Sequence, residues 1–264
     1  MVLLKQKRTR IYLVALAIIL ILAVLIFHHP YISIYDGFES SKLSRNWNTT
    51  RLEAHSVTFQ SDVVRKGKCA LKITLQNGDK VEDKTDKDNS SERDELMEAM
   101  SLYSVEGAKY EYKFSMFLPG NFPITPTRLV IAQWKQFCIL CPCSAYSPVL
   151  AIRYISGKLM ITLQTGSVRD TLYRSGDEIR NRWLDFKFQI RFSRQKDGEV
   201  KAFLAGKQIV NYKGITSYQD NCRVLSDKNK YYFKMGLYRD RMNVPMTIYI
   251  DEYSKNQMKE ELSN

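Results

Sequence analysis

The stretch KYYFKMGLYRDR, residues 230–241, decides the fold class because its side chains alternate as those of a β-strand do. Every second residue is apolar, which predicts a face packed on a core: Phe233, Met235 and Leu237. The opposite face carries two phenols, an ammonium group and a glycine: Tyr232, Tyr238, Lys234 and Gly236. Such a polar set on one strand raises the question of what that face binds.

The rest of the chain has the same character. About ten segments of strand length are separated by turn residues, and only the last residues, NQMKEELSN, suggest a helix. Two hairpins are predicted, one joining 148–155 to 158–165 across Ser-Gly, the other within 198–214 around Ala-Gly-Lys. The sequence therefore predicts an all-β protein, an antiparallel β-sandwich jelly roll of the concanavalin-like kind.

An apolar run of 17 residues, 11–27, stands near the N-terminus and is interrupted only by the hydroxyl of Tyr12. Its length is at the short end of the range for a transmembrane helix. Four basic residues and no acid precede it: Lys5, Lys7, Arg8 and Arg10. By the positive-inside rule, the N-terminus is predicted to stay in the cytoplasm and the remainder to be exported.

A cleaved signal peptide, which would give a secreted protein, is the alternative interpretation of this run. Cleavage requires small residues just after the apolar segment, and FHHPYISIY offers a poor site. We therefore expect a single-pass protein that contacts the membrane through an uncleaved anchor. The expected parts are a basic flank (1–10), the anchor (11–27), a stalk (28–35), the jelly roll (36–254) and a C-terminal tail (255–264).

The 264-residue chain has a net charge of +12, of which the basic flank supplies four, leaving +8. An exported domain rarely meets nucleic acid, so no nucleic-acid partner is expected. A basic surface outside the cytoplasm matches an acidic polymer, such as a uronic-acid polysaccharide, or anionic lipid. A solvated surface that happens to be basic is the plainer alternative. The oligomeric state is not decided by these features.

The chain has five cysteines: Cys69, Cys138, Cys141, Cys143 and Cys222. The crowded FCILCPC could bind zinc, but no second ligand pair stands nearby and no histidine follows Cys69. One or two disulfides, for instance from Cys222 to that cluster, fit an exported domain better, and an odd number leaves one thiol over. Cys69 is expected in a buried strand. No cofactor is expected, and nothing indicates a structural calcium ion.

Three short blocks resemble a known family. Arg-x-Glu-Leu occupies 93–96, Gln133 lies in IAQWKQ, and Tyr-Phe-Lys-x-Gly-x-Tyr occupies 232–238. Jelly-roll polysaccharide lyases of the alginate, glucuronan and heparin lyase I types carry similar blocks in this order. The segments SPVLAIRYISGKLMITL and PMTIYIDEY look most like the heparin lyase I-like branch. The resemblance covers roughly residues 36–254.

The resemblance implies cleavage of a uronic-acid polymer by β-elimination, in which a base removes the C5 proton and an acid protonates the oxygen leaving C4. It implies that Tyr238 is the catalytic tyrosine and that Arg93 and Gln133 neutralise the sugar carboxylate, with His55 completing the site. Other expected contacts with the substrate are Lys135, Lys234, Tyr232, Glu95, Arg153 and Trp134. From composition alone, Tyr238 reads equally as a rim aromatic, and Arg93 and Glu95 as a surface ion pair.

The chain departs from many relatives where they have Gln-x-His, because it has Gln133-Trp134-Lys135. Lysine keeps a positive charge but is a poor proton shuttle at neutral pH unless it is desolvated. His55 is the one histidine within the expected domain, and a surface histidine is its plain alternative. Two further hypotheses therefore stand beside the lyase: a non-catalytic carbohydrate-binding jelly roll and a structural envelope protein.

Overall fold

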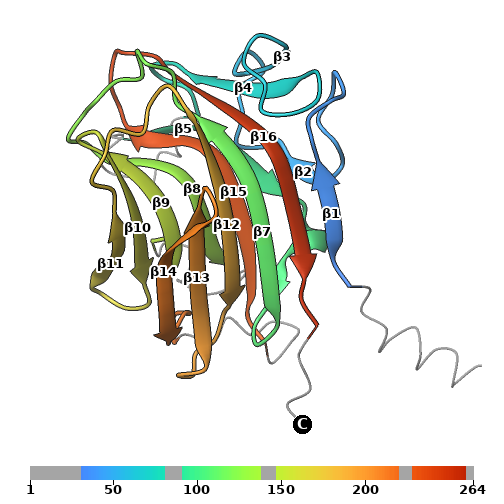
Figure 1. The fold of residues 1–264 in the computed structure, drawn as a ribbon, viewed down its shortest axis with the longest axis vertical. Helices are drawn as coiled ribbons and strands as arrows, with labels where there is room; N and C mark the ends of the chain where they lie inside the picture. Colours follow the sequence, from blue (N-terminus) through green and yellow to red (C-terminus); the bar gives the residue numbers. More distant parts are fainter. Residues whose placement is uncertain (1–30, 81–90, 138–146, 220–227, 260–264) are drawn as a thin grey trace, which may run out of the picture. The chain divides into compact units, whose positions relative to one another are not determined.

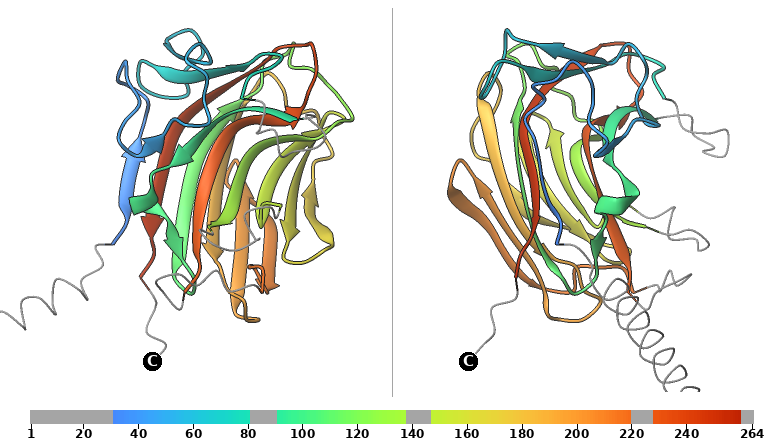
Figure 2. Two further views of the ribbon diagram at one scale, coloured as in Figure 1. Left: turned by 180° about the vertical axis from the view of Figure 1, so that it is seen from behind. Right: turned by 90° about the vertical axis from the view of Figure 1, so that its right-hand side faces the viewer.

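The computed structural model describes residues 31–80, 91–137, 147–219 and 228–259. The unit that begins at Ser33 contains two antiparallel sheets of eight strands each, which lie face to face (Figures 1 and 2). In the described ranges the only helical element is one 3₁₀ turn, Met100–Leu102. The predicted all-β antiparallel sandwich is confirmed. None of the described helical residues form a segment long and apolar enough to cross a membrane, and the anchor predicted at 11–27 lies outside the described residues.

One layer, called the site sheet below, is built around the stretch quoted first. Its strands in spatial order are β11 (Arg169–Arg174), β10 (Lys158–Gln164), β9 (Leu150–Ile155), β8 (Leu129–Phe137), β15 (Lys230–Asp240), β5 (Ser91–Glu98) and β2 (Trp47–Asn48). The short β6 (Ser104–Val105) also pairs with β15. Strand β15 therefore lies between β8 and β5, its neighbours for most of its length.

The other layer is called the back sheet. Its order is β14 (Lys207–Gly214), β13 (Gly198–Leu204), β12 (Trp183–Arg191), β7 (Lys109–Phe117), β16 (Met246–Gln257), β4 (Ala70–Leu75) and β3 (Val57–Gln60), with β1 (Ser33–Asp36) paired to β16. Residues 33–35, expected in a stalk, thus belong to a strand. Likewise β16 continues to Gln257, where a tail and a helix were expected.

Both predicted hairpins are confirmed, and their turns explain why. Ser156 and Gly157, between β9 and β10, have φ of 51° and 79°, while Ala205 and Gly206, between β13 and β14, have φ of 49° and 79°. Two successive residues at positive φ form the turn whose twist matches that of the joined strands. Glycine at the second position accepts this conformation without a clash.

Aromatic side chains fill the space between the sheets. The ring of Trp134 lies 4.8 Å from those of Phe188 and Phe233 and 5.4 Å from that of Tyr112. Trp134 is fully buried. The expectation that it contacts substrate is therefore wrong, because the two-residue period of β8 turns it inward while its neighbours on either side turn outward.

A charged pair is also buried between the sheets. Lys255 donates a hydrogen bond to Glu98 at 3.0 Å, and the hydroxyl of Tyr253 donates to the same carboxylate at 2.5 Å. Both charged side chains have zero exposed area. Breaking such a pair by removing one partner leaves an uncompensated buried charge. The residues around position 255 are thus part of the core.

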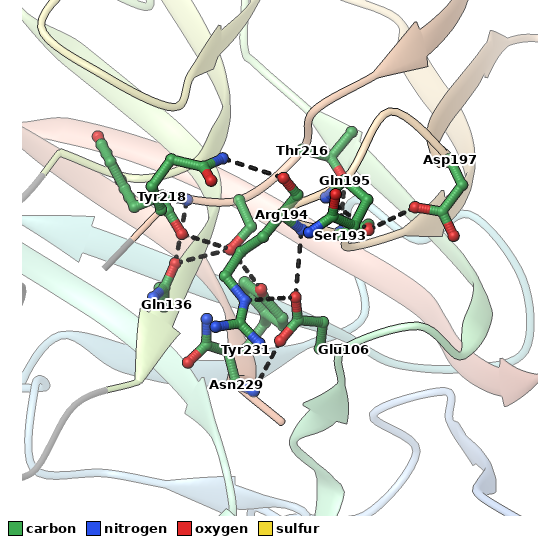
Figure 3. A network of polar contacts seen from close by, with 12 residues as sticks. Glu106, Gln136, Ser193, Arg194, Gln195, Asp197, Thr216, Tyr218, Asn229 and Tyr231 are labelled. Carbon is green, nitrogen blue, oxygen red and sulfur yellow. Dashed lines mark hydrogen bonds and ion pairs between the residues drawn. The ribbon is translucent and has the colours of Figure 1, made fainter. Parts of the chain in front are cut away.

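A polar network joins the ends of β8 and β15 to neighbouring loops (Figure 3). The carboxylate of Glu106 accepts hydrogen bonds from the side chain of Arg194 at 2.8 Å and the backbone of Asn229 at 3.0 Å. The amide oxygen of Gln136 accepts one from Ser217 at 3.0 Å, and Tyr231 donates to Ser217 at 2.5 Å. This network holds the two central strands of the site sheet at one end.

Replacing Lys255 with Met should lower the free energy of unfolding by about 3–5 kcal/mol, because Glu98 would stay buried without its cation. Urea unfolding followed by tryptophan fluorescence measures this. The double variant Glu98→Gln/Lys255→Met should recover much of the loss. Equal stability of wild type and Lys255→Met would show that the pair is dispensable.

Candidate functional site

The outer face of the site sheet gathers residues that are far apart in the sequence. Strand β5 supplies Arg93 and Glu95, β8 supplies Gln133, and β15 supplies Lys234 and Tyr238. The register places Tyr238 opposite Arg93, and Lys234 opposite Gln133. Because alternate residues of a strand share a face, the three motifs predicted from the sequence meet on one surface.

Glu95 is the centre of this cluster. Its carboxylate accepts a hydrogen bond from Lys234 at 2.8 Å, lies 3.5 Å from a terminal nitrogen of Arg93, and also accepts a short hydrogen bond from the amide of Gln133. Lys234 is 3% exposed and Gln133 1%, so this polar set is buried. The sequence predicts that this strand face is exposed to solvent, whereas the structure shows that its polar side chains are buried against one another.

The cluster has more positive than negative charge. Burial lowers the pKa of Lys234 to about 8, and the nearby cations Arg93 and Lys135 also lower it. The negative charge of Glu95 acts in the opposite direction and offsets only part of this effect. Burial favours a higher pKa for Glu95, but Lys234, Arg93 and the amide of Gln133 together hold that pKa below its ordinary value. The two shifts have different causes: burial dominates at Lys234, whereas neighbouring cations and an amide dominate at Glu95. An added anion would be attracted to such a site.

Tyr238 lies half-buried at the edge of this cluster between two arginines. The guanidinium of Arg93 lies 4.1 Å from the centre of its ring, and that of Arg128 lies 5.0 Å away. Arg128, which comes just before β8, also pairs with Asp240 at 2.7 Å. Sequence reasoning missed Arg128 because it stands in a loop and no motif marks it.

Lys135 and Tyr232 lie further along the same face, opposite each other in register. Tyr232 stacks on Tyr103 with ring centres 5.3 Å apart, and burial raises its pKa well above the usual value. Tyr103, which follows the 3₁₀ turn, was not predicted. Tyr232 therefore offers a neutral aromatic surface beside the charged cluster.

Gly236, in the middle of β15, is required by the strand itself. It has φ of 139°, and a Cβ at this position would lie 2.3 Å from the backbone oxygen of Asp94. The pairing of β15 with β8 also shifts register between Met235 and Tyr238. This irregularity contributes to the placement of Tyr238.

Arg153 lies on β9, which is separated from Tyr238 on β15 by one strand, β8. It is paired with Val130, which in turn is paired with Tyr238. Its side chain is 3% exposed and donates to the hydroxyl of Thr162 at 3.1 Å. The structure thus brings Arg153 to the same sheet as the three motifs, as expected for a residue near the substrate.

His55 lies apart from these residues. Its ring is 3.1 Å from the carboxylate of Asp79, and 47% of its side chain is exposed. No contact in the described part of the chain joins it to Tyr238 or Gln133. Its nearest link to the cluster is through the backbone, because the carbonyl of Asp79 accepts a hydrogen bond from the amide of Arg93 at 3.1 Å.

A hollow of about 480 Å³ lies on the back sheet, away from the predicted residues. Its acids are already engaged: Asp185 is bound by Arg65 at 2.8 Å, and Glu252 by the hydroxyl of Tyr35 at 2.5 Å. Within the described ranges, no group of three or more His, Cys, Asp or Glu residues could hold a metal ion. Cys69 is free and half-exposed, and the other four cysteines lie outside the described residues.

Comparison with known proteins identifies the family. The family model described as polysaccharide lyase matches residues 38–254. The chain belongs to the polysaccharide lyase family. No curated protein sequence matches it.

Solved structures of polysaccharide lyases share the fold at low identity. An endo-β-1,4-glucuronan lyase from the fungus Trichoderma reesei is 17% identical, with 85% of this chain and 95% of that chain covered and a TM-score of 0.64. An alginate lyase bound to an alginate trisaccharide is 12% identical, with 87% and 98% covered and a TM-score of 0.56. A cellulose-induced protein is 11% identical, with 84% and 96% covered and a TM-score of 0.55.

The depressed pKa of Lys234 predicts how stability changes with pH. Between about pH 8, its folded pKa, and the ordinary lysine value, the unfolded chain binds more protons at this site, so raising the pH favours the folded state. The free energy of unfolding of wild type should therefore rise, relative to Lys234→Met, as pH goes from about 8 to 10. Urea titrations of both proteins measure this difference, and a constant difference would contradict the shift.

Proposed function

We propose that this polysaccharide lyase cleaves a uronic-acid polysaccharide by β-elimination on the outer face of the site sheet. The observation that carries the proposal is Tyr238 held between Arg93 and Arg128, beside a buried cluster in which one carboxylate serves several cations. An acidic sugar is the ligand that such a surface attracts.

Neutralisation of the sugar carboxylate is the first requirement of the reaction, because the C5 proton is very weakly acidic beside an ionised carboxylate. Arg93 and Gln133 carry donors on the outer face, and Glu95 holds both in place. A side-chain amide has two N–H donors, so the contact of Gln133 with Glu95 leaves one for substrate. Lys135 supplies further positive charge next to Lys234.

Proton transfer falls to Tyr238 in this proposal. Its phenolate takes the C5 proton, the electron pair forms the C4=C5 double bond, and the bond from C4 to the leaving oxygen breaks. The phenol then returns a proton to that oxygen, which requires both groups on the same side of the sugar.

The identity of the polymer is a separate proposal. Two of the similar structures are a glucuronan lyase and an alginate lyase, so polymers of glucuronic, mannuronic and guluronic acid are the first candidates. The heparin lyase I-like branch predicted from the sequence stays a prediction. Assay of a panel that includes heparin, with absorbance of the conjugated double bond as readout, decides between these polymers.

A glycan-binding protein without catalysis is the second candidate function, and two observations favour it. Lys135 stands where many relatives have histidine, and His55 is bound to Asp79 instead of lying beside Tyr238. Binding of a polyuronate with no unsaturated product would establish this alternative. Lys135→His would then be the first change to test for restored activity.

Replacing Tyr238 with Phe should reduce elimination by about 10³-fold or more, because the hydroxyl that serves as base and acid is lost while the ring remains. Release of unsaturated product, measured by ultraviolet absorbance, is the assay. Tyr249→Phe, on the back sheet, is the matched control and should keep full activity. Product formation by Tyr238→Phe at the wild-type rate would refute the assignment.

We also propose that residues 11–27 anchor the protein in a membrane, with the lyase domain on the far side from the cytoplasm. The support is the apolar run and the basic flank before it. Since β1 begins at Ser33, a chain that starts at residue 31 keeps every described strand.

The full chain should sediment with membranes and require detergent for release, whereas the chain from residue 31 should stay in the aqueous supernatant. Alkaline carbonate extraction followed by immunoblotting distinguishes an integral anchor from peripheral binding. A full-length chain that appears shortened in the supernatant would indicate a cleaved signal peptide instead.

A further inference from the structure

Arg153 is a buried cation without an acidic partner in the described part of the chain. It is 3% exposed, and the hydroxyl of Thr162, a neutral group, accepts its one hydrogen bond there. Guanidinium groups buried in folded proteins are normally paired with carboxylates, since removal of a lone charge from water costs several kcal/mol. A residue of this kind requires an explanation.

The surroundings of Arg153 make its charge less favourable still. Burial lowers the pKa of Arg153 to about 10, and the nearby cations Arg169 and Arg128 act in the same direction. Arg128 is neutralised by Asp240. Arg169 is exposed and donates only to uncharged groups within the described ranges, Gln164 at 3.1 Å and Ser147 at 3.4 Å. Two arginines thus lie near each other, and no acid among the described residues pairs with either.

The position of Arg153 links it to the site. Arg153 is paired with Met160 on β10. Leu159 and Ile161 point into the core, so Met160 and Thr162, which alternate with them, lie on the outer face of the sheet. In register, Arg153, Val130, Tyr238 and Arg93 form one row across β9, β8, β15 and β5. Neighbouring strands are about 4.8 Å apart, and two such spacings separate β9 from β15. The backbone of Arg153 therefore lies about 10 Å from that of Tyr238, on the side away from Arg93.

We propose that Arg153, assisted by Arg169, binds the carboxylate of a second uronic acid, next along the chain from the sugar whose carboxylate meets Arg93. This inference rests on the proposed function and deepens it, because it makes the enzyme specific for polymers with carboxylates on more than one sugar near the cleaved bond. The anion supplies Arg153 with an acidic partner, and a guanidinium can hold a carboxylate through two parallel hydrogen bonds.

The test measures binding separately from catalysis, in the Tyr238→Phe background. Isothermal titration with a β-1,4-linked glucuronic acid hexamer should show affinity weakened about tenfold to a hundredfold by the additional change Arg153→Met. Lys187→Met, which removes one positive charge from the back sheet, is the matched control and should change affinity little. A carboxyl-reduced hexamer should bind weakly and show no dependence on Arg153.

A stability measurement separates this role from a structural one. Because Arg153 has no acid partner within the described residues, Arg153→Met should unfold at a temperature no lower than its parent. A lower unfolding temperature with unchanged hexamer affinity would overturn the proposal. If the Met variant does not fold, Arg153→Lys decides: it keeps the charge and loses the paired donors, so it should bind more weakly than the parent, and equal affinity would overturn the inference.

Other outcomes are equally decisive. Binding of a sulfated, uronate-free carrageenan hexamer that depends on Arg153 would replace carboxylate with sulfate and overturn the assignment. Hexamer binding that depends on Arg153, together with a wild type that forms no unsaturated product from any polyuronate, would retain this inference and refute the elimination. A parent that binds no acidic hexamer would refute both.

Discussion

The site depends on one buried carboxylate, that of Glu95, because it holds side chains from three strands at once. Lys234 from β15, Gln133 from β8 and Arg93 from its own strand all contact it. Each of these groups would be costly to bury alone, and each is tolerated because the others satisfy it. The cluster therefore orients donors rigidly toward the outer face, where flexible surface side chains would lose entropy on binding substrate.

Positive charge exceeds negative charge across this face, and the cations differ in how far carboxylates offset their charge. Around Glu95 the cations share a carboxylate, around Tyr238 one arginine is paired with Asp240, and at Arg153 the described residues supply no acid. The protein thus holds unfavourable electrostatic energy in the absence of ligand. Such strain at a binding surface is a common compromise between stability and function, since an anionic substrate relieves it.

The buried pair Glu98–Lys255 shows that polar interiors in this protein have a second, structural role. It joins β5 of the site sheet to β16 of the back sheet, and the backbone amide of Phe233 also donates to Glu98 at 3.1 Å. Glu95 and Glu98 belong to the same short strand but point to opposite faces. One carboxylate fixes the two sheets together, and the other organises the surface that carries the proposed chemistry.

The sequence by itself determined the sandwich and its hairpins, because the two-residue period and turn residues such as Ser156-Gly157 are local signals. The meeting of the three motifs was implied by the resemblance alone, and it is the register between strands that brings them together. The sequence could not decide which polar residues are buried. Lys234 read as solvated, Lys255 as part of a tail, and Trp134 as a substrate contact, although their exposure depends on strands distant in the chain. Only the tertiary structure showed that His55 pairs with Asp79, that Arg128 lies beside Tyr238, and that Arg153 has no acidic partner among the described residues. Electrostatic neighbours such as these come from pairing between distant strands, which no local pattern encodes.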